Sequence, residues 1–175
     1  MTYDKDSKHA QELGRVVLPI VKKALGAKRI ISCELDNATI VSLFDRYAGV
    51  DAVTVDKHGV RGIALRIQRQ KHARWESFTI RCSRRSGVAT ELQKRLHNIE
   101  HGYIYPYLTC QFYCDVNGNI IYGSIIRTTD LYEYVRNKLV FLCDHQYRQA
   151  SEGEGFIYIL FDQLQNYGGY KMLRW

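Results

Sequence analysis

The fold is decided by two neighbouring stretches of the chain, AGVDAV at residues 48–53 and GIALRIQRQ at residues 62–70. The first stretch is β-rich, and a turn that contains glycine separates it from the second. In the second stretch apolar and polar residues alternate, which is the pattern of a half-buried strand. Because side chains on a strand alternate with period two, Arg66 and Gln68 project from one face. We therefore predict a pair of strands in which Asp51 begins the first and lies beside the polar face of the second.

The rest of the chain supplies helices and further strands around this pair. Apolar residues at three- and four-residue spacing predict helices over 7–25, 90–99 and 128–142. Strands are predicted over 29–34, 77–82, 107–114, 119–127 and 155–161, the last with both faces buried, while 36–45 fits a helical turn or a loop. This order predicts an α/β fold of the mixed α+β kind, a single domain over residues 1–175 whose mixed central sheet is flanked by helices.

Composition and cysteine usage indicate an ordinary globular protein. The chain is 46% hydrophobic and 25% charged, and its five cysteines are an odd number with no Cys-x-x-Cys pair, so structural thiols are favoured over a zinc site. The first residues are polar, with no apolar core of a signal peptide behind them. We therefore expect reduced thiols, a cytoplasmic location and no membrane partner, since no stretch approaches the roughly 18 apolar residues of a membrane span.

Positive charge is concentrated in the middle of the chain. Residues 57–95 contain eleven lysines and arginines against two acidic residues, in a protein whose formal net charge is +7. Clustered cations attract polyanions and speed encounter with them, so the segment favours nucleic acid, DNA above all, as partner. A solvated basic face that keeps the protein in solution is the alternative.

One part of this segment has the composition of a phosphate-binding loop. Residues 81–87, RCSRRSG, combine three arginines, two serines and a glycine just before the helix expected at Thr90. Arginine offers a rigid fork of donors to phosphate, and a helix start adds backbone N–H groups. The predicted nucleic-acid-binding residues are Arg66, Arg69, Lys71, Arg81, Arg84 and Arg85.

The strand pair also has the residue types that metal-assisted phosphodiester cleavage needs. A carboxylate such as that of Asp51 can hold a divalent cation that lowers the pKa of a bound water. A neighbouring cation or amide, here Arg66 or Gln68, can orient the nucleophile and the phosphate. The alternative for Asp51 is an acid at the start of a strand that makes a local hydrogen bond.

This order of elements resembles the restriction-endonuclease-like PD-(D/E)XK nuclease superfamily. In that family an Asp begins the second core strand, a Glu-x-Lys-type motif lies on the third, and a Glu from the first helix often joins them. The resemblance covers residues 7–127, with 128–175 as a C-terminal extension. It implies a restriction-endonuclease-like core in which Asp51 and Glu12 hold Mg²⁺ and Asp51, Gln68 and Glu12 are catalytic. The strand motif falls on 66–68 or 68–70, and neither triplet has the acidic first residue or the final Lys.

We therefore expect a nucleic-acid-binding protein with a nuclease-like core, with Mg²⁺-dependent endonuclease activity on DNA as its most specific form. The incomplete triplet favours a second hypothesis, a non-catalytic DNA- or RNA-binding protein on the same scaffold. A third is a protein-interaction or viral accessory domain whose basic strip meets an acidic protein. Thirteen tyrosines can stack on bases, fill strand faces or form an oligomer interface, which leaves a homodimer open.

Overall fold

Nine strands form two separate sheets in the computed structural model, which describes residues 3–33, 48–57, 59–69, 76–150 and 153–174. The fold is mixed α+β, as the order of elements predicts. None of the helices described is both long and apolar enough to span a membrane.

Sheet A has six strands and contains the predicted strand pair. In spatial order its strands are β1 (Arg29–Ser32), β2 (Ala52–Asp56), β3 (Gly59–Arg69), β5 (Leu108–Cys114), β6 (Ile120–Arg127) and β9 (Lys171–Arg174). β2 and β3 pair in antiparallel fashion, with Ala52 opposite Ile63. β3 and β5 run parallel, so the chain between them must cross over, and the remaining neighbours are antiparallel.

Sheet B is smaller, with the order β4 (Ser77–Ser83), β8 (Gly155–Leu160) and β7 (Tyr147–Gln149). Sheet A is the mixed central sheet that the order of elements predicts, but β4 does not join it and pairs instead with β8. The prediction that the last long strand is buried on both faces is wrong. Along β8 fully buried residues alternate with half-buried ones such as Phe156 and Tyr158. Alternation with period two means that one face of sheet B is packed and the other is partly open.

Helices cover both sheets. The predicted helices are present as α1 (Tyr3–Leu25), α3 (Glu91–Glu100) and α4 (Thr128–His145), and a short 3-10 helix, η3 (Phe161–Leu164), follows β8. Thr90 caps α3 through a reciprocal capping box with Gln93, which satisfies two of the first backbone donors of the helix. The N-terminus of α3, expected as a phosphate contact, is thus already capped by side chains.

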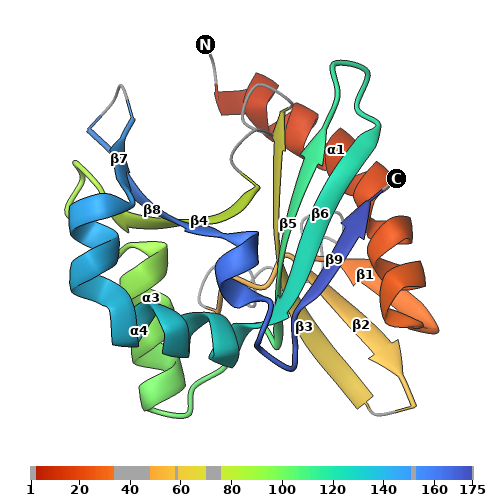
Figure 1. Cartoon of the computed structure of the whole chain (residues 1–175). Helices are drawn as coiled ribbons and strands as arrows, with labels where there is room; N and C mark the ends of the chain where they lie inside the picture. Colours follow the sequence, from red (N-terminus) through yellow and green to blue (C-terminus); the bar gives the residue numbers. More distant parts are fainter. Residues whose placement is uncertain (1–2, 34–47, 58, 70–75, 151–152, 175) are drawn as a thin grey trace.

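Two hydrophobic cores place the sheets relative to the helices (Figure 1). One lies between α1 and sheet A, where Val17 and Val21 pack against Ile63 and Phe112. The larger core joins sheet B to α3, α4 and η3, and Phe78 is among its fully buried members. The cysteines fit the expectation of structural thiols. All five are free, and Cys33, directly after β1, is buried, as are Cys110 and Cys114 on β5.

One buried tyrosine connects the two sheets directly. The hydroxyl of Tyr113 on β5 donates to the carbonyl of Ser77 on β4 at 2.8 Å and accepts from its backbone N–H at 3.4 Å. Both residues are fully buried. Burial raises the pKa of Tyr113 above its ordinary value of 10, so its hydroxyl keeps its proton and the donor role.

Candidate nucleic-acid interface

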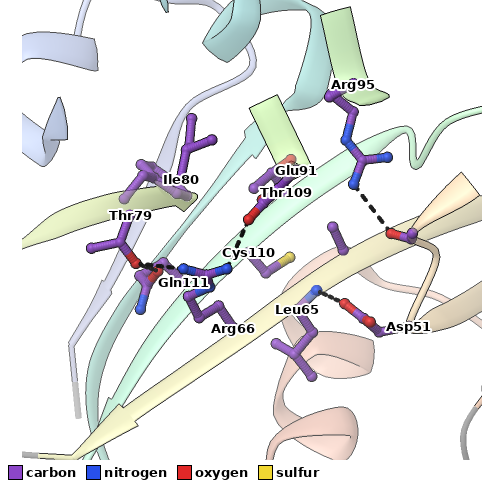
Figure 2. Close-up of a pocket in the computed structure, with 13 residues that line it drawn as sticks. Asp51, Leu65, Arg66, Thr79, Ile80, Glu91, Arg95, Thr109, Cys110 and Gln111 are labelled. Atoms are coloured by element: carbon purple, nitrogen blue, oxygen red, sulfur yellow. Dashed lines mark hydrogen bonds and ion pairs between the residues drawn. The ribbon is translucent and has the colours of Figure 1, made fainter. Parts of the chain in front are cut away.

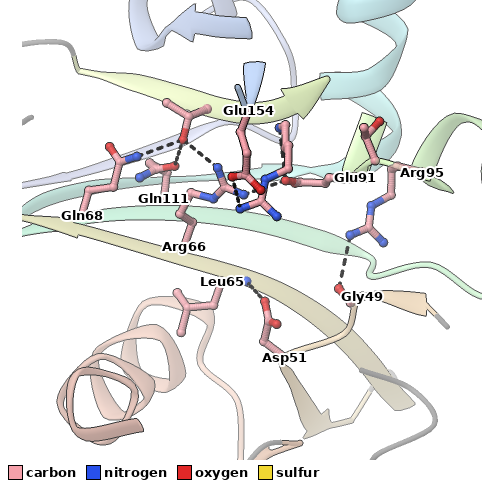
Figure 3. A network of polar contacts seen from close by, with 12 residues as sticks. Gly49, Asp51, Leu65, Arg66, Gln68, Glu91, Arg95, Gln111 and Glu154 are labelled. Atoms are coloured by element: carbon pink, nitrogen blue, oxygen red, sulfur yellow. Dashed lines mark hydrogen bonds and ion pairs between the residues drawn. The ribbon is translucent and has the colours of Figure 1, made fainter. Parts of the chain in front are cut away.

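A polar network lies between the two sheets, where β4 of sheet B passes close to β3 and β5 of sheet A (Figure 3). Its centre is the hydroxyl of Thr79 on β4, which accepts from Arg66 Nη1 at 3.2 Å and from Gln68 Nε2 at 3.1 Å. The same hydroxyl donates to Oε1 of Gln111 on β5 at 3.3 Å. A hydroxyl has one proton and two lone pairs, so all its hydrogen-bonding capacity is used. The polar face predicted for β3 is therefore present, and it faces the other sheet.

Two carboxylates hold the arginines of this network in place. Glu91, at the start of α3, pairs with Arg66 at 2.7 Å, and Glu154 pairs with Arg81 of β4 at 3.2 Å. Partial burial lowers the pKa of Arg81 below its ordinary value, while Glu154 acts in the opposite direction. Arginine remains protonated throughout the physiological range, so both guanidinium groups are fixed positive charges.

Cavities lie on both sides of the network, and Thr79 lines each of them. The first has a volume of about 190 Å³ and is bounded by the segment around Asp51, by β3, β4 and β5, and by α3 (Figure 2). The second has a volume of about 290 Å³ and lies between the end of β3 and the open face of sheet B. Gln111 is 1% exposed and its Nε2 has no hydrogen-bond partner among the residues described, so a buried donor remains at the first cavity.

The open face of sheet B carries cations beside aromatic rings. Phe156 on β8 lies directly opposite Arg81 on one side and Arg148 of β7 on the other. The guanidinium groups of Arg66 and Arg81 lie 5.7 and 5.4 Å from the centre of the Phe156 ring, and that of Arg148 lies 5.0 Å from the centre of Tyr158. These distances are within the roughly 6 Å of a cation–π contact. We call Thr79, Arg81, Arg148, Phe156 and Tyr158 the aromatic face.

Asp51 makes a hydrogen bond of the kind that the sequence left as the alternative. Its carboxylate Oδ2 accepts the backbone N–H of Leu65 at 2.5 Å, just beyond the point where β2 stops pairing with β3. The segment before it is fixed by Arg95, a buried residue of α3. Its Nη1 donates to the carbonyl of Ala48 at 2.6 Å, and its Nη2 donates to that of Gly49 at 3.2 Å, the contact drawn in Figure 3. Arg95 belongs to the basic segment by sequence, but its guanidinium is used inside the fold to hold the backbone of Ala48 and Gly49 in place.

Asp51 and Glu12, the residues predicted to hold Mg²⁺, lie on different parts of the fold, Asp51 directly before β2 and Glu12 on α1. Glu12 is exposed on α1, and the next residue, Leu13, lies beside Gly118 in the turn between β5 and β6. Gln68 donates to Thr79 and lines the second cavity, whereas Asp51 lines the first (Figures 2 and 3). Within the described ranges no three His, Cys, Asp or Glu side chains gather where they could hold a metal ion.

The predicted phosphate-binding residues divide into two groups. Arg66 and Arg81 lie in the network, whereas Arg85 is exposed and Arg84 half-exposed in the turn after β4. Arg69 is exposed at the end of β3. Lys71 lies outside the described residues. The guanidinium groups of the first group both lie against the ring of Phe156. We call the turn with Arg84 and Arg85, which follows β4 directly, the rim.

Several residues of this site were not predicted from the sequence, namely Thr79, Glu91, Gln111, Arg148, Glu154, Phe156 and Tyr158. The signal was present in β8, where Phe and Tyr alternate with Ile at positions 156–159. A continuous apolar run was interpreted as burial on both faces, but in the structure the aromatic positions face the open side of sheet B.

Comparisons with known proteins identify no relative. The chain matches no protein-family model, and no curated protein sequence matches it.

Proposed function

We propose that this protein binds nucleic acid in the space between its two sheets, with phosphates on the arginines and bases beside the aromatic face. The observation that carries the proposal is the meeting of Arg66 from sheet A with Arg81 and Arg148 from sheet B around two half-buried aromatic rings. Arginine pairs with phosphate through two parallel hydrogen bonds, and aromatic rings accept bases by stacking.

The rim of this space supplies the first contact with a phosphate backbone. Arg84 and Arg85 follow directly on β4, and Gly87 completes their turn with a φ of +68°. Among the residues described, neither arginine has an ion pair. Cations without an ion pair have no carboxylate to give up on binding a phosphate, so they contribute mainly through release of counterions.

The internal ion pairs set how strongly the inner arginines can act. Glu154 neutralises part of the charge of Arg81, so a phosphate must compete with this carboxylate. Removing the carboxylate charge by Glu154→Gln should therefore increase affinity several-fold. If Arg81 served only to stabilise the fold, Glu154→Gln would destabilise the protein and would not increase its affinity for nucleic acid.

The test compares two double variants with the same change in charge. Arg84→Ala with Arg85→Ala removes the rim, and Lys22→Ala with Lys23→Ala removes two exposed cations from the last turn of α1, on the other side of sheet A. Binding of a labelled oligonucleotide is measured from 50 to 300 mM salt in equal steps. The rim variant should lower the slope of log affinity against log salt by about 1.4 to 1.8, the value for two phosphate contacts, and the α1 variant should leave it unchanged. Equal losses in both variants would contradict the proposal.

The nuclease prediction is tested in the same experiment. Because the carboxylate of Asp51 accepts a hydrogen bond from the backbone of β3 and Glu12 lies on a separate element, we propose binding without cleavage. Affinity should be the same with Mg²⁺ and with a chelator, and the oligonucleotide should remain intact. Metal-dependent cleavage that is lost in Asp51→Ala would overturn this part and restore the nuclease-like function.

A further inference from the structure

We infer that the aromatic face takes an unpaired base, so that the ligand is single-stranded nucleic acid and not a duplex. The inference rests on the proposed function and specifies its ligand. It comes from the arrangement of β4, β8 and β7 and from the cavity of about 290 Å³ beside them.

The cross-strand order places rings and cations in one row. Arg81, Phe156 and Arg148 are direct neighbours across the three strands, and Thr79 and Tyr158 form the next row along. Side chains opposite each other in a sheet lie about 4.5–5.5 Å apart at their Cβ atoms, so the row is a continuous surface of π-systems and guanidinium planes. Single-stranded nucleic acids bind by stacking bases on such surfaces.

The cavity beside this surface has the polar groups that a base edge needs. Gln68 and Gln149 contribute side-chain amides, and Ser77 contributes a hydroxyl, around the rings of Phe156 and Tyr158. The hydroxyl of Thr79 also lines the cavity, but its hydrogen bonds are already made within the network. An amide offers both a donor and an acceptor, which is the pattern on the Watson–Crick edge of a base. The volume lies at the lower limit of small-ligand pockets, roughly 300 Å³, which suits one base and excludes a bulky cofactor.

A duplex does not present its bases in the required way. In a double helix the ring faces are covered by neighbouring base pairs, and only the edges are accessible in the grooves. A base can reach the rings of the aromatic face only after it leaves the stack, which costs a few kcal/mol in a duplex and much less in a single strand. The site should therefore distinguish the two forms by that cost.

The experiment measures binding of a labelled 12-nucleotide oligothymidine and of a duplex of the same length, at one salt concentration. Phe156→Ala should weaken binding of the single strand by about 5- to 150-fold, the effect of losing one base stack. Phe141→Ala is the matched control, since Phe141 is an aromatic residue on α4 that is 46% exposed. Circular dichroism and unfolding in urea check that both variants fold.

A second variant gives a direct signal and does not depend on loss of binding. Phe156→Trp keeps an aromatic ring, so it should retain affinity, and its added fluorescence should be quenched by oligothymidine when the base stacks on it. The wild-type protein supplies the background from its two natural tryptophans.

The outcomes separate this inference from the proposed function. Binding of the duplex at least as tightly as the single strand, or equal affinities for Phe156→Ala and Phe141→Ala, would overturn the inference while leaving nucleic-acid binding intact. Thymidine monophosphate that binds as tightly as the oligomer would also overturn it, because the ligand would then be a free nucleotide. Absence of salt-dependent binding to either nucleic acid would reject the proposed function and the inference together.

Discussion

The hydroxyl of Thr79 gives the most direct test of how the two sheets are held together. Thr79→Val replaces it with a methyl group of nearly the same shape and removes three hydrogen bonds, those to Arg66, Gln68 and Gln111. Thr79→Ser is the matched control, because serine keeps the hydroxyl and loses only a methyl group. The difference between the two variants therefore isolates the network from the packing.

The magnitude follows from the exposure of the three partners. Gln111 is 1% exposed, so its Oε1 cannot turn to water, and a buried acceptor without a partner costs about 1–3 kcal/mol. Arg66 and Gln68 are half-exposed and can be hydrated, at a cost of up to about 1 kcal/mol each. We expect Thr79→Val to lower the free energy of unfolding by about 2–4 kcal/mol, and Thr79→Ser by about 1 kcal/mol or less.

Unfolding in urea, followed by circular dichroism, measures both values, and an unchanged dependence on urea concentration confirms that the same surface is exposed. Adding Gln111→Leu to Thr79→Val removes the stranded amide and should recover about 1 kcal/mol or more. Equal destabilisation by Thr79→Val and Thr79→Ser, or no recovery in the double variant, would show that the network does not contribute in this way.

Three further perturbations test the fold and the site. Arg95→Met leaves the carbonyls of Ala48 and Gly49 without their donor, so the free energy of unfolding should fall by about 3–5 kcal/mol. The backbone amide of Asp51 should also exchange faster with deuterium. Unchanged exchange at Asp51 would show that Arg95 does not hold this segment in place. Tyr113→Phe should cost about 1–2 kcal/mol at pH 7 in thermal or urea unfolding. Because the pKa of Tyr113 is higher in the folded protein, the unfolded chain loses that proton first as the pH rises. The contribution of Tyr113 to the free energy of unfolding should therefore be fully present below about pH 10 and fall above it. The fall should be less steep in Tyr113→Phe, and parallel pH profiles of the two proteins would contradict this. Glu154→Gln should increase affinity for oligothymidine several-fold in a fluorescence titration, and a decrease would show that the Arg81–Glu154 pair is needed intact.

The local elements could be predicted from the sequence because their signals are local. The spacing of apolar residues in α1 and α4 and the alternation in β3 identify helices and strand to within a few residues. The same alternation predicted that Arg66 and Gln68 share a face, and the structure places both on Thr79. The period of the apolar pattern and the face on which a side chain lies are properties of a single segment, so they can be predicted without knowing what that segment packs against.

The assembly of the elements could not be predicted because it depends on partners distant in sequence. β4 pairs with β8, some eighty residues further on, and neither strand's own sequence identifies its partner. Arg66 and Arg81 were predicted as phosphate contacts without their carboxylates, since Glu91 and Glu154 become neighbours only in the folded chain. The pairing of Asp51 with the backbone of β3 was similarly one of two alternatives until the register was known.

The two links between the sheets, through Thr79 and Tyr113, also have a kinetic consequence. They hold the walls of the proposed binding space, between the two sheets, at one separation before a ligand arrives, so association should need no preceding opening step. The observed rate of binding should then rise linearly with oligonucleotide concentration in a single phase, accelerated at low salt by the arginines of the rim. In Thr79→Val, where one link is lost, a second phase that does not depend on ligand concentration should appear, and its rate would report how fast the two sheets move apart.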